Sequence, residues 1–393
     1  MTTDSLIPTY ARLPVHFTEG SGVWLTDTQG NKYLDAISGI GVCGLGHCHP
    51  AVTQAITEQA SRLVHTSNLY HIDNQAELAE RLCHLSGMSR VFFGNSGAEA
   101  NEAAIKLARL HGHKKGIEVP TIIVMEDAFH GRTLATLSAT GNRKVQAGFE
   151  PLIRGLTRAP YNDVEAIKTI AKNNANIVAI LVEPVQGEGG LNIPASDYLN
   201  ALKDICDEHD WLLMLDEVQT GNGRTGEYFS YQHNGILPDV VTTAKGLGNG
   251  FPIGACLVAG KATELFQPGS HGSTYGGSPL GCATALSVLN TLERDGLIQR
   301  ASELGQRINN GLTDRLADLE NVTEIRNKGL MIGIELAVPC VELVEQALNK
   351  GLLINVTAGN VVRLLPPLVL SNTEADEIIK KLSTLISTFL LKQ

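Results

Sequence analysis

The chain has 393 residues, of which 43% are hydrophobic and 18% charged, and its formal net charge is −10. This length predicts two or three domains, and the composition is typical of a globular protein with a large buried core. Lysine and arginine form no run longer than a pair, so a nucleic-acid-binding surface is not expected. No apolar run approaches the roughly 18 residues of a membrane span, so no membrane segment is expected either.

The seven cysteines are scattered and include no CxxC pair, which favours free thiols in a reducing compartment. The first residues, MTTDSLIPTYARLPVHF, are polar where a secretory signal would be apolar. We therefore expect a cytoplasmic protein. His47, Cys48 and His49 have no second ligand pair at a suitable spacing, so no metal site is predicted.

The predicted elements begin with a hairpin over residues 23–37, in which two alternating runs flank the turn Asp27–Asn31. From residue 50 onward, amphipathic helical patterns alternate with short apolar runs. The patterns predict helices over 50–63, 76–85, 95–112 (ended by Gly112) and 196–210, and strands over 90–93, 121–127, 176–184, 211–218 and 239–245.

Continuous apolar strands that alternate with helices indicate an α/β fold with a mainly parallel sheet covered on both faces. Ligands of such sheets bind at the carboxyl ends of the strands. Glu183, Asp216 and Lys245 all lie at predicted strand ends, so they are expected to share a site. From about residue 280 a helix over 280–297, apolar runs over 329–338, 351–356 and 360–370, and a helix near 340–350 predict a smaller α+β domain.

The stretch GIGVCG at 39–44 matches GxGxxG literally, but no helix pattern follows it, and a dinucleotide site is not predicted. The stretch Gly94-Asn95-Ser96-Gly97-Ala98 joins a strand to a helix and has three interpretations. Ser96 could be a nucleophile on a sharp turn. Ser96, Gly97 and Ala98 could bind an anion at the helix N-terminus. Ser96 could also be an ordinary N-cap.

An acid and a lysine stand out at two other strand ends. Asp216 ends an almost wholly apolar strand, where a carboxylate is costly unless it meets a cation, although it could simply cap a turn. Lys245 lies in AKGLGNG, where glycines leave room for a ligand, although a surface lysine is the plainer interpretation. A desolvated lysine can form a Schiff base with an aldehyde. An anion-binding site, an acid and such a lysine together fit pyridoxal phosphate. Asp216 would keep the ring nitrogen of this cofactor protonated.

Motifs along nearly the whole chain resemble the class III, pyridoxal-phosphate-dependent aminotransferases. The most specific are LDEVQTGNGRTG at 215–226 and AKGLGNGFPIGA at 244–255. The others are GHCHP (46–50), HTSNLY (65–70), NSGAEANEAAIKLAR (95–109), FHGRT (129–133), EPVQGEGG (183–190), STYGGSPL (273–280) and VVRLLPP (361–367). The resemblance implies fold-type I, with a large cofactor-binding domain over 46–279 and a small domain built from 1–45 and 280–393.

The resemblance also implies roles around the cofactor. Lys245 would bind its aldehyde, Asp216 would contact the ring nitrogen, and Gln219 the phenolic oxygen. Phe129 would stack on the ring, with Val218 also in the site. Ser96, Gly97 and Ala98 would hold the phosphate. Thr274 would reach the phosphate of a neighbouring subunit, which implies a homodimer.

For the substrates, the resemblance implies that Arg132 grips the carboxylate of the amino donor, with Ser273 nearby, and that Arg363 grips the α-carboxylate of 2-oxoglutarate or glutamate. Each arginine alone could equally form a surface ion pair. Glu183 would pair with Arg363 while the donor is bound and release it for the keto acid. Kinetics would be ping-pong.

The donor implied by the resemblance is N2-acetyl-L-ornithine, with succinyldiaminopimelate and ornithine as alternatives. Ornithine-specific relatives carry a tyrosine where this chain has Ile40, which favours an acylated donor. Two other hypotheses remain: a serine hydrolase that uses Ser96, Asp216 and a histidine such as His271, and a non-catalytic cofactor-binding protein on the same fold.

Overall fold

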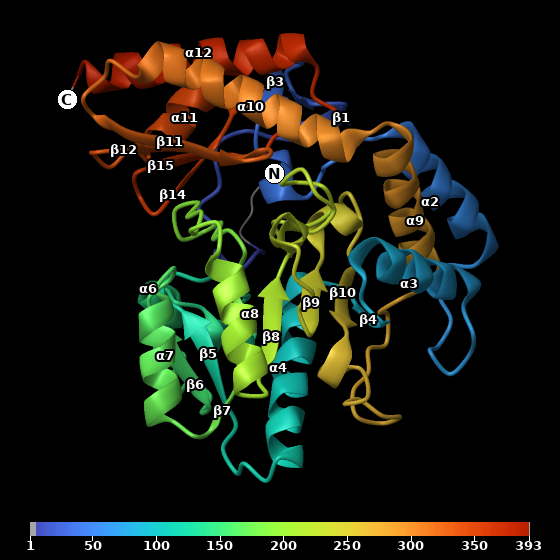
Figure 1. The fold of residues 1–393 in the computed structure, drawn as a ribbon. Helices are drawn as coiled ribbons and strands as arrows, with labels where there is room; N and C mark the ends of the chain where they lie inside the picture. Colours follow the sequence, from blue (N-terminus) through green and yellow to red (C-terminus); the bar gives the residue numbers. More distant parts are fainter. Residues whose placement is uncertain (1–4, 393) are drawn as a thin grey trace.

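The computed structural model describes residues 5–392. Its centre is a sheet of seven strands in the order β4-β10-β9-β8-β7-β5-β6 (Figure 1). β10 runs antiparallel to its two neighbours, and the other adjacent pairs are parallel, which confirms a mainly parallel sheet. The strands are β4 (Arg90–Gly94), β5 (Thr121–Met125), β6 (Leu156–Ala159), β7 (Ile177–Val182), β8 (Leu212–Asp216), β9 (Val240–Thr243) and β10 (Gly254–Val258).

Helices cover both faces of this sheet, which is why its inner strands are mainly apolar. On one face, α4 (Gly97–Lys114) packs its alanines and leucines against alternate strand residues such as Val124 and Met214. On the other face, α8 (Tyr198–Glu208) lies against β7 and β8, where the intervening residues such as Leu213 point. The period of two along each strand therefore divides the core into two layers.

Helix α4 does not end at Gly112, as the sequence pattern suggested, but continues to Lys114. A Cβ atom on Gly112 would lie 2.6 Å from Pro120 Cβ and 2.8 Å from Val178 Cγ1. Gly112 is therefore needed for close packing of the helix on the sheet. Gly116, with φ of +77°, follows the helix and takes the left-handed conformation that commonly ends helices.

On one side of the molecule, α2 (Pro50–Arg62) and α3 (Asp73–Ser86) both pack against α9 (Pro279–Arg294) (Figure 1). The helix predicted over 280–297 is wrong at its end, because Gly296 adopts a φ of +62° and separates α9 from the next helix. Shorter helices around the large sheet are α5 (Leu134–Ala139), α6 (Arg143–Gln146) and α7 (Val164–Asn173).

Two smaller sheets combine the chain ends. The predicted hairpin is confirmed as β2 (Trp24–Asp27) and β3 (Lys32–Asp35), between β1 (Phe17–Ser21) and β13 (Leu352–Leu353). Because β13 pairs with β3, both ends of the chain meet in one sheet. The domain boundaries at 45/46 and 279/280 stay a prediction.

The second sheet has the order β11-β12-β15-β14, formed by β11 (Val322–Lys328), β12 (Met331–Leu336), β15 (Val361–Leu364) and β14 (Asn355–Thr357).

Two long helices, α10 (Leu297–Leu316) and α12 (Asn372–Leu390), pack against each other beside the second small sheet (Figure 1). Neither helix was predicted from the sequence. The short helix α11 (Leu343–Leu348) matches the one expected near 340–350. The GIGVCG stretch contains α1 (Ser38–Gly41), in which Gly39 and Ile40 have positive φ, so it is a left-handed turn.

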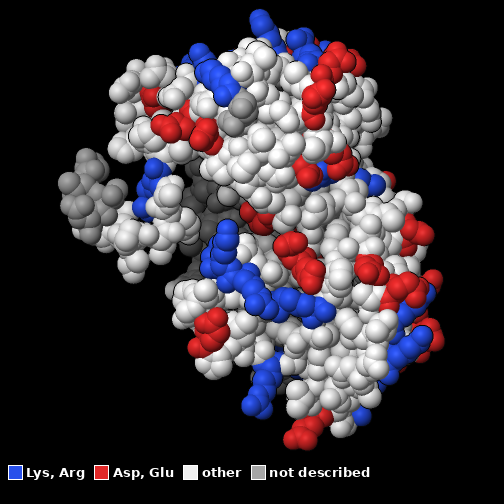
Figure 2. Space-filling model, turned by 90° about the vertical axis from the view of Figure 1, so that its left-hand side faces the viewer, with Lys and Arg blue, Asp and Glu red and all other residues white. Residues whose placement is uncertain are grey.

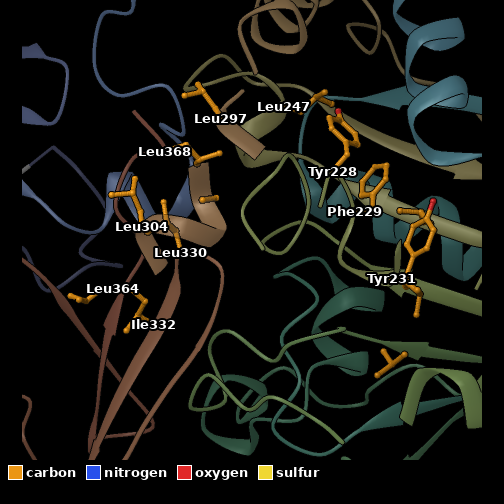
Figure 3. Close-up of a cluster of buried hydrophobic side chains, with 14 of the residues drawn as sticks. Tyr228, Phe229, Tyr231, Leu247, Leu297, Leu304, Leu330, Ile332, Leu364 and Leu368 are labelled. Carbon is orange, nitrogen blue, oxygen red and sulfur yellow. The ribbon is translucent and has the colours of Figure 1, made fainter. Parts of the chain in front are cut away.

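One apolar core continues from the small sheets into the large domain. Figure 3 shows the core running from Ile332 on β12, through Leu368, to Tyr228 and Phe229 near the large sheet. On the surface, Figure 2 shows lysine and arginine side chains interspersed with aspartate and glutamate over one face. None of the helices within residues 5–392 combines the length and apolar character needed to span a bilayer. The expected cytoplasmic location stays a prediction.

Candidate active site

A cavity of about 410 Å³ lies where the parallel strands of the large sheet end. The position is the one expected for ligands of such sheets. Of the predicted site residues, Ser273, Thr274 and Arg363 do not line this cavity. The predicted residues that do line it are Ser96, Gly97, Ala98, Phe129, Arg132, Glu183, Asp216, Val218, Gln219 and Lys245.

The N-terminus of α4 forms one wall of the cavity. Ser96 is the N-cap, and its hydroxyl accepts a hydrogen bond from the Glu99 backbone N–H at 3.2 Å. A Cβ atom on Gly97 would lie 2.8 Å from Val218 Cγ1, so the close approach of these two segments requires glycine. The N-cap interpretation of Ser96 is therefore confirmed. The same turn presents backbone N–H groups to the cavity, which is the geometry of an anion site.

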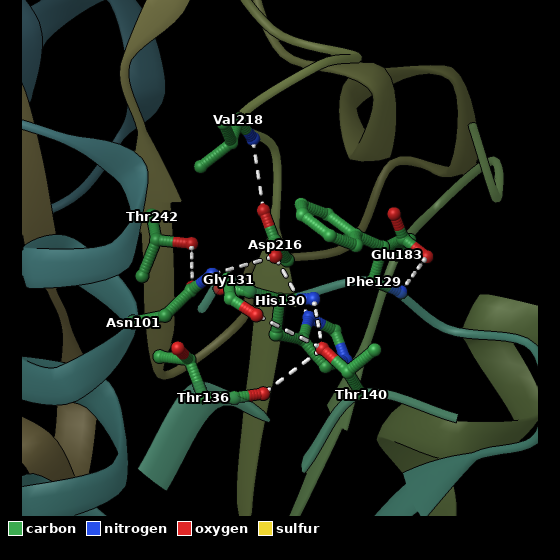
Figure 4. A network of polar contacts seen from close by, with 10 residues as sticks. All are labelled: Asn101, Phe129, His130, Gly131, Thr136, Thr140, Glu183, Asp216, Val218 and Thr242. Carbon is green, nitrogen blue, oxygen red and sulfur yellow. Dashed lines mark hydrogen bonds and ion pairs between the residues drawn. The ribbon is translucent and has the colours of Figure 1, made fainter. Parts of the chain in front are cut away.

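Asp216, at the end of β8, is only 4% exposed. Its Oδ2 atom accepts hydrogen bonds from His130 Nδ1 and Asn101 Nδ2, each at 2.7 Å, and its Oδ1 atom accepts one from the Val218 N–H at 3.0 Å (Figure 4). Among residues 5–392, no lysine or arginine forms an ion pair with this carboxylate. The site thus holds a buried, well-ordered carboxylate without a cationic side-chain partner.

Lys245 lies two residues beyond β9, in a backbone conformation with φ of +45° that is uncommon outside glycine. Burial lowers the pKa of its amine, although the nearby carboxylates of Glu188, Asp216 and Glu183 act in the opposite direction. Lowering the pKa increases the fraction of neutral amine, which is the nucleophilic and basic form.

Arg363 pairs with Glu188, not with Glu183, so the predicted pairing is wrong. Arg363 on β15 is fully buried, and its Nη1 donates to Glu188 Oε1 at 2.7 Å. Burial would raise the pKa of Glu188, but the guanidinium outweighs this and lowers it. Glu183 instead accepts a hydrogen bond from the Phe129 N–H at 3.2 Å, and burial together with the nearby Asp216 raises its pKa. A protonated Glu183 would be a poor partner for a guanidinium.

Arg132 differs from Arg363 in being exposed at the cavity. Its guanidinium carbon lies 5.6 Å from the centre of the Phe129 ring, a distance typical of a cation–π contact. Within residues 5–392, Arg132 forms no ion pair with an acidic side chain. It is therefore open to a carboxylate ligand, whereas Arg363 is covered by Glu188.

The serine hydrolase hypothesis fails on geometry. His271 contacts Lys106 at 2.9 Å and packs on Phe92 and Phe266, away from the cavity-lining residues. Asp216 is bonded to a different histidine, and the Ser96 hydroxyl is engaged with Glu99. Among residues 5–392, no histidine is hydrogen-bonded to the Ser96 hydroxyl, so the Ser-His-Asp arrangement is not formed.

The sequence profile of the family Aminotransferase class-III matches residues 7–386. The chain belongs to the class III aminotransferases. It is 59% identical over 382 residues to the acetylornithine aminotransferase of Nitrosomonas europaea, with 97% of each chain covered. It is 52% identical over 391 residues to acetylornithine aminotransferase 1 of Bordetella bronchiseptica, with 100% of each chain covered.

Solved structures of class III aminotransferases have the same fold as this chain. The ornithine aminotransferase of Toxoplasma gondii ME49 has a TM-score of 0.95 at 32% identity, covering 99% of this chain and 94% of that one. The acetylornithine aminotransferase of Elizabethkingia anophelis has a TM-score of 0.87 at 33% identity, covering 97% and 96%. These similarities confirm the expected fold-type I architecture.

Class III aminotransferases use pyridoxal phosphate, and the cavity of this chain fits that cofactor. The N-terminus of α4 can receive the phosphate, because Gly97 leaves its backbone N–H accessible at the cavity wall. The Asp216 carboxylate, which forms no ion pair with a lysine or arginine within residues 5–392, provides a partner for a protonated ring nitrogen. Phe129 and Val218 line the space beside that carboxylate (Figure 4), and Lys245 provides an amine for the aldehyde.

Three residues of this class III site were missed by sequence reasoning. Glu188 and His130 lie inside the quoted motifs EPVQGEGG and FHGRT, but no role was assigned to either. Asn101 is a polar residue on the buried face of α4, which was the available signal. Each makes its decisive contact with a residue distant in sequence, so local spacing did not reveal the contact.

Proposed function

We propose that this class III aminotransferase transfers the δ-amino group of N2-acetyl-L-ornithine to 2-oxoglutarate, giving N-acetyl-L-glutamate 5-semialdehyde and L-glutamate in arginine biosynthesis. Relatives named acetylornithine aminotransferase, 45–59% identical over nearly the full chain, support this assignment. The structural observation that carries it is the unequal state of two arginines: Arg132 is open, and Arg363 is covered by Glu188.

The open arginine suits the donor. A donor that reacts at its terminal amine has its carboxylate several bonds away, and Arg132 at the exposed side of the cavity can grip that carboxylate. With Arg363 held by Glu188, the reacting end of the donor meets no free guanidinium. Val42 adds an apolar side chain to the lining, which suits an acylated donor better than a charged α-ammonium group.

Pyridoxal phosphate, when bound, supplies the aldehyde that carries the amino group and a ring that withdraws electrons. Asp216 would hold the ring nitrogen in its cationic form, and Gln219 would contact the ring's phenolic oxygen. The Lys245 amine, made less basic by burial, would accept a proton from the donor's δ-carbon and later return one. Phe129, which lines the cavity, would stack on the ring.

The covered arginine suits the acceptor. 2-Oxoglutarate carries a carboxylate next to its reacting carbon, so its binding requires Arg363 to be released from Glu188. Arg363 stays oriented during this exchange, because its Nη2 also donates to Asn355 Oδ1 at 2.8 Å. The Arg363 Nε atom is buried without a partner, and an incoming carboxylate can satisfy it.

The test compares kcat/KM for acetylornithine, ornithine and succinyldiaminopimelate, each with 2-oxoglutarate. We expect acetylornithine to give the highest value. A higher value for ornithine would contradict the proposed donor and favour the activity named for the solved Toxoplasma gondii relative. A higher value for succinyldiaminopimelate would assign the second alternative. Lys245→Ala should abolish turnover in every case.

We also propose that the active unit is a homodimer in which Thr274 of one copy reaches the phosphate site of the other. Thr274 is exposed and does not line the cavity of its own chain. The segment that carries Thr274 lies against residues 65–68, because Asn68 donates a hydrogen bond to Ser273 O and the rings of His65 and Tyr275 are 5.4 Å apart. Several exposed apolar side chains belong to these two segments or to residues next to them in sequence. The apolar patch consists of Leu63, Val64, Leu69, Tyr70 and Tyr275, which are between 49% and 86% exposed.

A further inference from the structure

The orientation of the Asp216 carboxylate depends on a buried amide from another element. Asn101 on α4 is 1% exposed, and its Nδ2 atom donates to Asp216 Oδ2 at 2.7 Å and to the His130 carbonyl oxygen at 2.8 Å (Figure 4). Hydrogen bonds from an amide to a carboxylate are stronger than neutral ones. The Asn101 amide therefore ties helix α4 to the end of β8 at the carboxylate itself.

The direction of the Asn101 amide is set by a third element. Thr242 on β9 donates its hydroxyl proton to Asn101 Oδ1 at 2.7 Å, and Thr242 is fully buried. A flipped amide would direct its oxygen at the Asp216 carboxylate and at a carbonyl, both of which are acceptors. Thr242 is also the register partner of Asp216 between β9 and β8, so Asn101 bonds to side chains on two adjacent strands.

His130 completes the arrangement of hydrogen bonds around Asp216. Its Nδ1 atom lies 2.7 Å from Asp216 Oδ2, and its Nε2 atom is buried without a partner. A proton on Nε2 would leave a buried donor unsatisfied, so this contact is one in which Nδ1–H donates to the carboxylate. Asp216 thus receives three hydrogen bonds, from His130, Asn101 and the Val218 N–H.

We infer that Asn101 is a positioning residue that holds the Asp216 carboxylate in the orientation needed to contact the ring nitrogen of the cofactor, and that Thr242 sets the direction of the Asn101 amide. This inference rests on the proposed role of Asp216. It assigns a function to two residues whose side chains serve neither the phosphate, the aldehyde nor the substrate carboxylates. Loss of either contact should weaken the attraction between carboxylate and ring nitrogen without removing any other cofactor contact.

The test uses Asn101→Ala, Thr242→Val and Thr242→Ser in the full-length protein. Two readouts are taken without substrate: the dissociation constant of pyridoxal phosphate, and the pH at which the visible absorption of the bound cofactor changes. We expect Asn101→Ala and Thr242→Val to weaken cofactor binding by about tenfold or more. Both should shift the pH midpoint in the same direction as Asp216→Asn. Thr242→Ser keeps the hydroxyl and should behave like the unmodified chain.

Thr291→Val is the matched control, because Thr291 is also fully buried but bonds only within α9. If Asn101→Ala fails to fold, Thr242→Val carries the test by itself. An unshifted pH midpoint in Thr242→Val, with Asp216→Asn shifted, would overturn the inference and leave the role of Asp216 intact. An unshifted midpoint in Asp216→Asn would instead contradict the proposed role of Asp216.

Discussion

Glu188 and Arg363 show how one ion pair can serve two substrates. The pair is 2.7 Å long, and its guanidinium is fully buried. Such a pair is hard to leave broken, because an unpaired buried charge is strongly unfavourable. In the proposed mechanism, the keto acid opens the pair because its own carboxylate replaces that of Glu188 at Arg363. Glu188 would then exclude other α-carboxylates from Arg363 until one of the correct geometry binds.

Replacing Glu188 by Gln should shift the preference of the enzyme between donors. With the negative charge removed, Arg363 is free to bind the α-carboxylate of glutamate at all times. We expect the ratio of kcat/KM for glutamate to that for acetylornithine to rise by about tenfold or more. The ratio is measured from single-turnover reactions with each donor. Glu183→Gln is the control, because Glu183 does not contact Arg363, and an equal shift there would contradict the assignment.

Glu217 provides a pH prediction at a residue beside the site. This side chain is fully buried and accepts a hydrogen bond from the Tyr231 N–H at 2.9 Å. Burial raises its pKa from 4.5 to about 7. The folded chain therefore keeps the Glu217 proton to a higher pH than the unfolded chain does. The resulting contribution to stability is present below pH 4.5 and is lost as the pH rises toward 7.

Glu217→Gln should remove this pH dependence, because glutamine stays neutral. Between pH 4.5 and pH 8, the unmodified chain should lose roughly 3 kcal/mol of unfolding free energy that the variant does not lose. Urea unfolding at both pH values measures the difference. Parallel changes in the two proteins would show that Glu217 titrates alike in the folded and unfolded chains.

At the scale of elements, helix α4 contacts both the candidate active site and the large sheet. Its N-terminus faces the cavity, its second turn carries Asn101, and its far end packs tightly on the sheet at Gly112. The helix crosses several strands, so a displacement at one end is transmitted to the other. Close packing at Gly112 therefore supports the alignment of the residues around Asp216.

Gly112→Ala should destabilise the protein although alanine favours helices. The new Cβ atom would overlap Pro120 and Val178, and overpacking of this kind costs about 1–3 kcal/mol, more than the gain of about 1 kcal/mol in helix propensity. The thermal unfolding midpoint measures the effect. Lys106→Ala on the exposed side of α4 is the control and should change stability little. A midpoint for Gly112→Ala that equals or exceeds that of the unmodified chain would be inconsistent with this packing role.

At the scale of the whole molecule, the proposed dimer predicts complementation between two inactive variants. Lys245→Ala disables a site from within, and Thr274→Asp would place a carboxylate next to the phosphate of the other copy. The two variants are mixed in equal amounts, unfolded and refolded together. Half of the dimers should then contain one copy of each variant, and each such dimer has one intact site of two. The mixture should therefore recover about a quarter of full activity. No recovery is expected if Thr274 serves the site of its own chain.

The apolar patch can be tested with a matched pair of leucines. Leu69 lies in the patch and Leu391 lies at the end of α12, and both are 86% exposed. Leu69→Ser should weaken dimer formation, as measured by sedimentation, and lower cofactor affinity with it. Leu391→Ser should leave both unchanged. Equal effects of the two substitutions would show that the patch has no special part in assembly.

The sequence by itself determined the mainly parallel sheet, the hairpin, about half of the helices within residues 5–392, and the family. Apolar runs with a period of two, caps and glycine-rich turns depend on neighbours within a few residues, so they can be inferred from the sequence. The helix end predicted at Gly112 was wrong, because this position is glycine to allow close packing against Pro120 and Val178 on other segments. The long helices α10 and α12 were missed, although their apolar faces are buried in the same core as the rest.

Only the tertiary structure decided which charged and polar groups meet. Arg363 and Glu188 are 175 positions apart, and Asn101 and Asp216 are 115 apart, so no local spacing encodes either contact. Both Glu183 and Glu188 lie in one motif, and the choice between them depends on which carboxylate the fold directs toward β15. Folding brings these groups into a buried space where water cannot substitute for a missing partner, and there geometry selects the pairings.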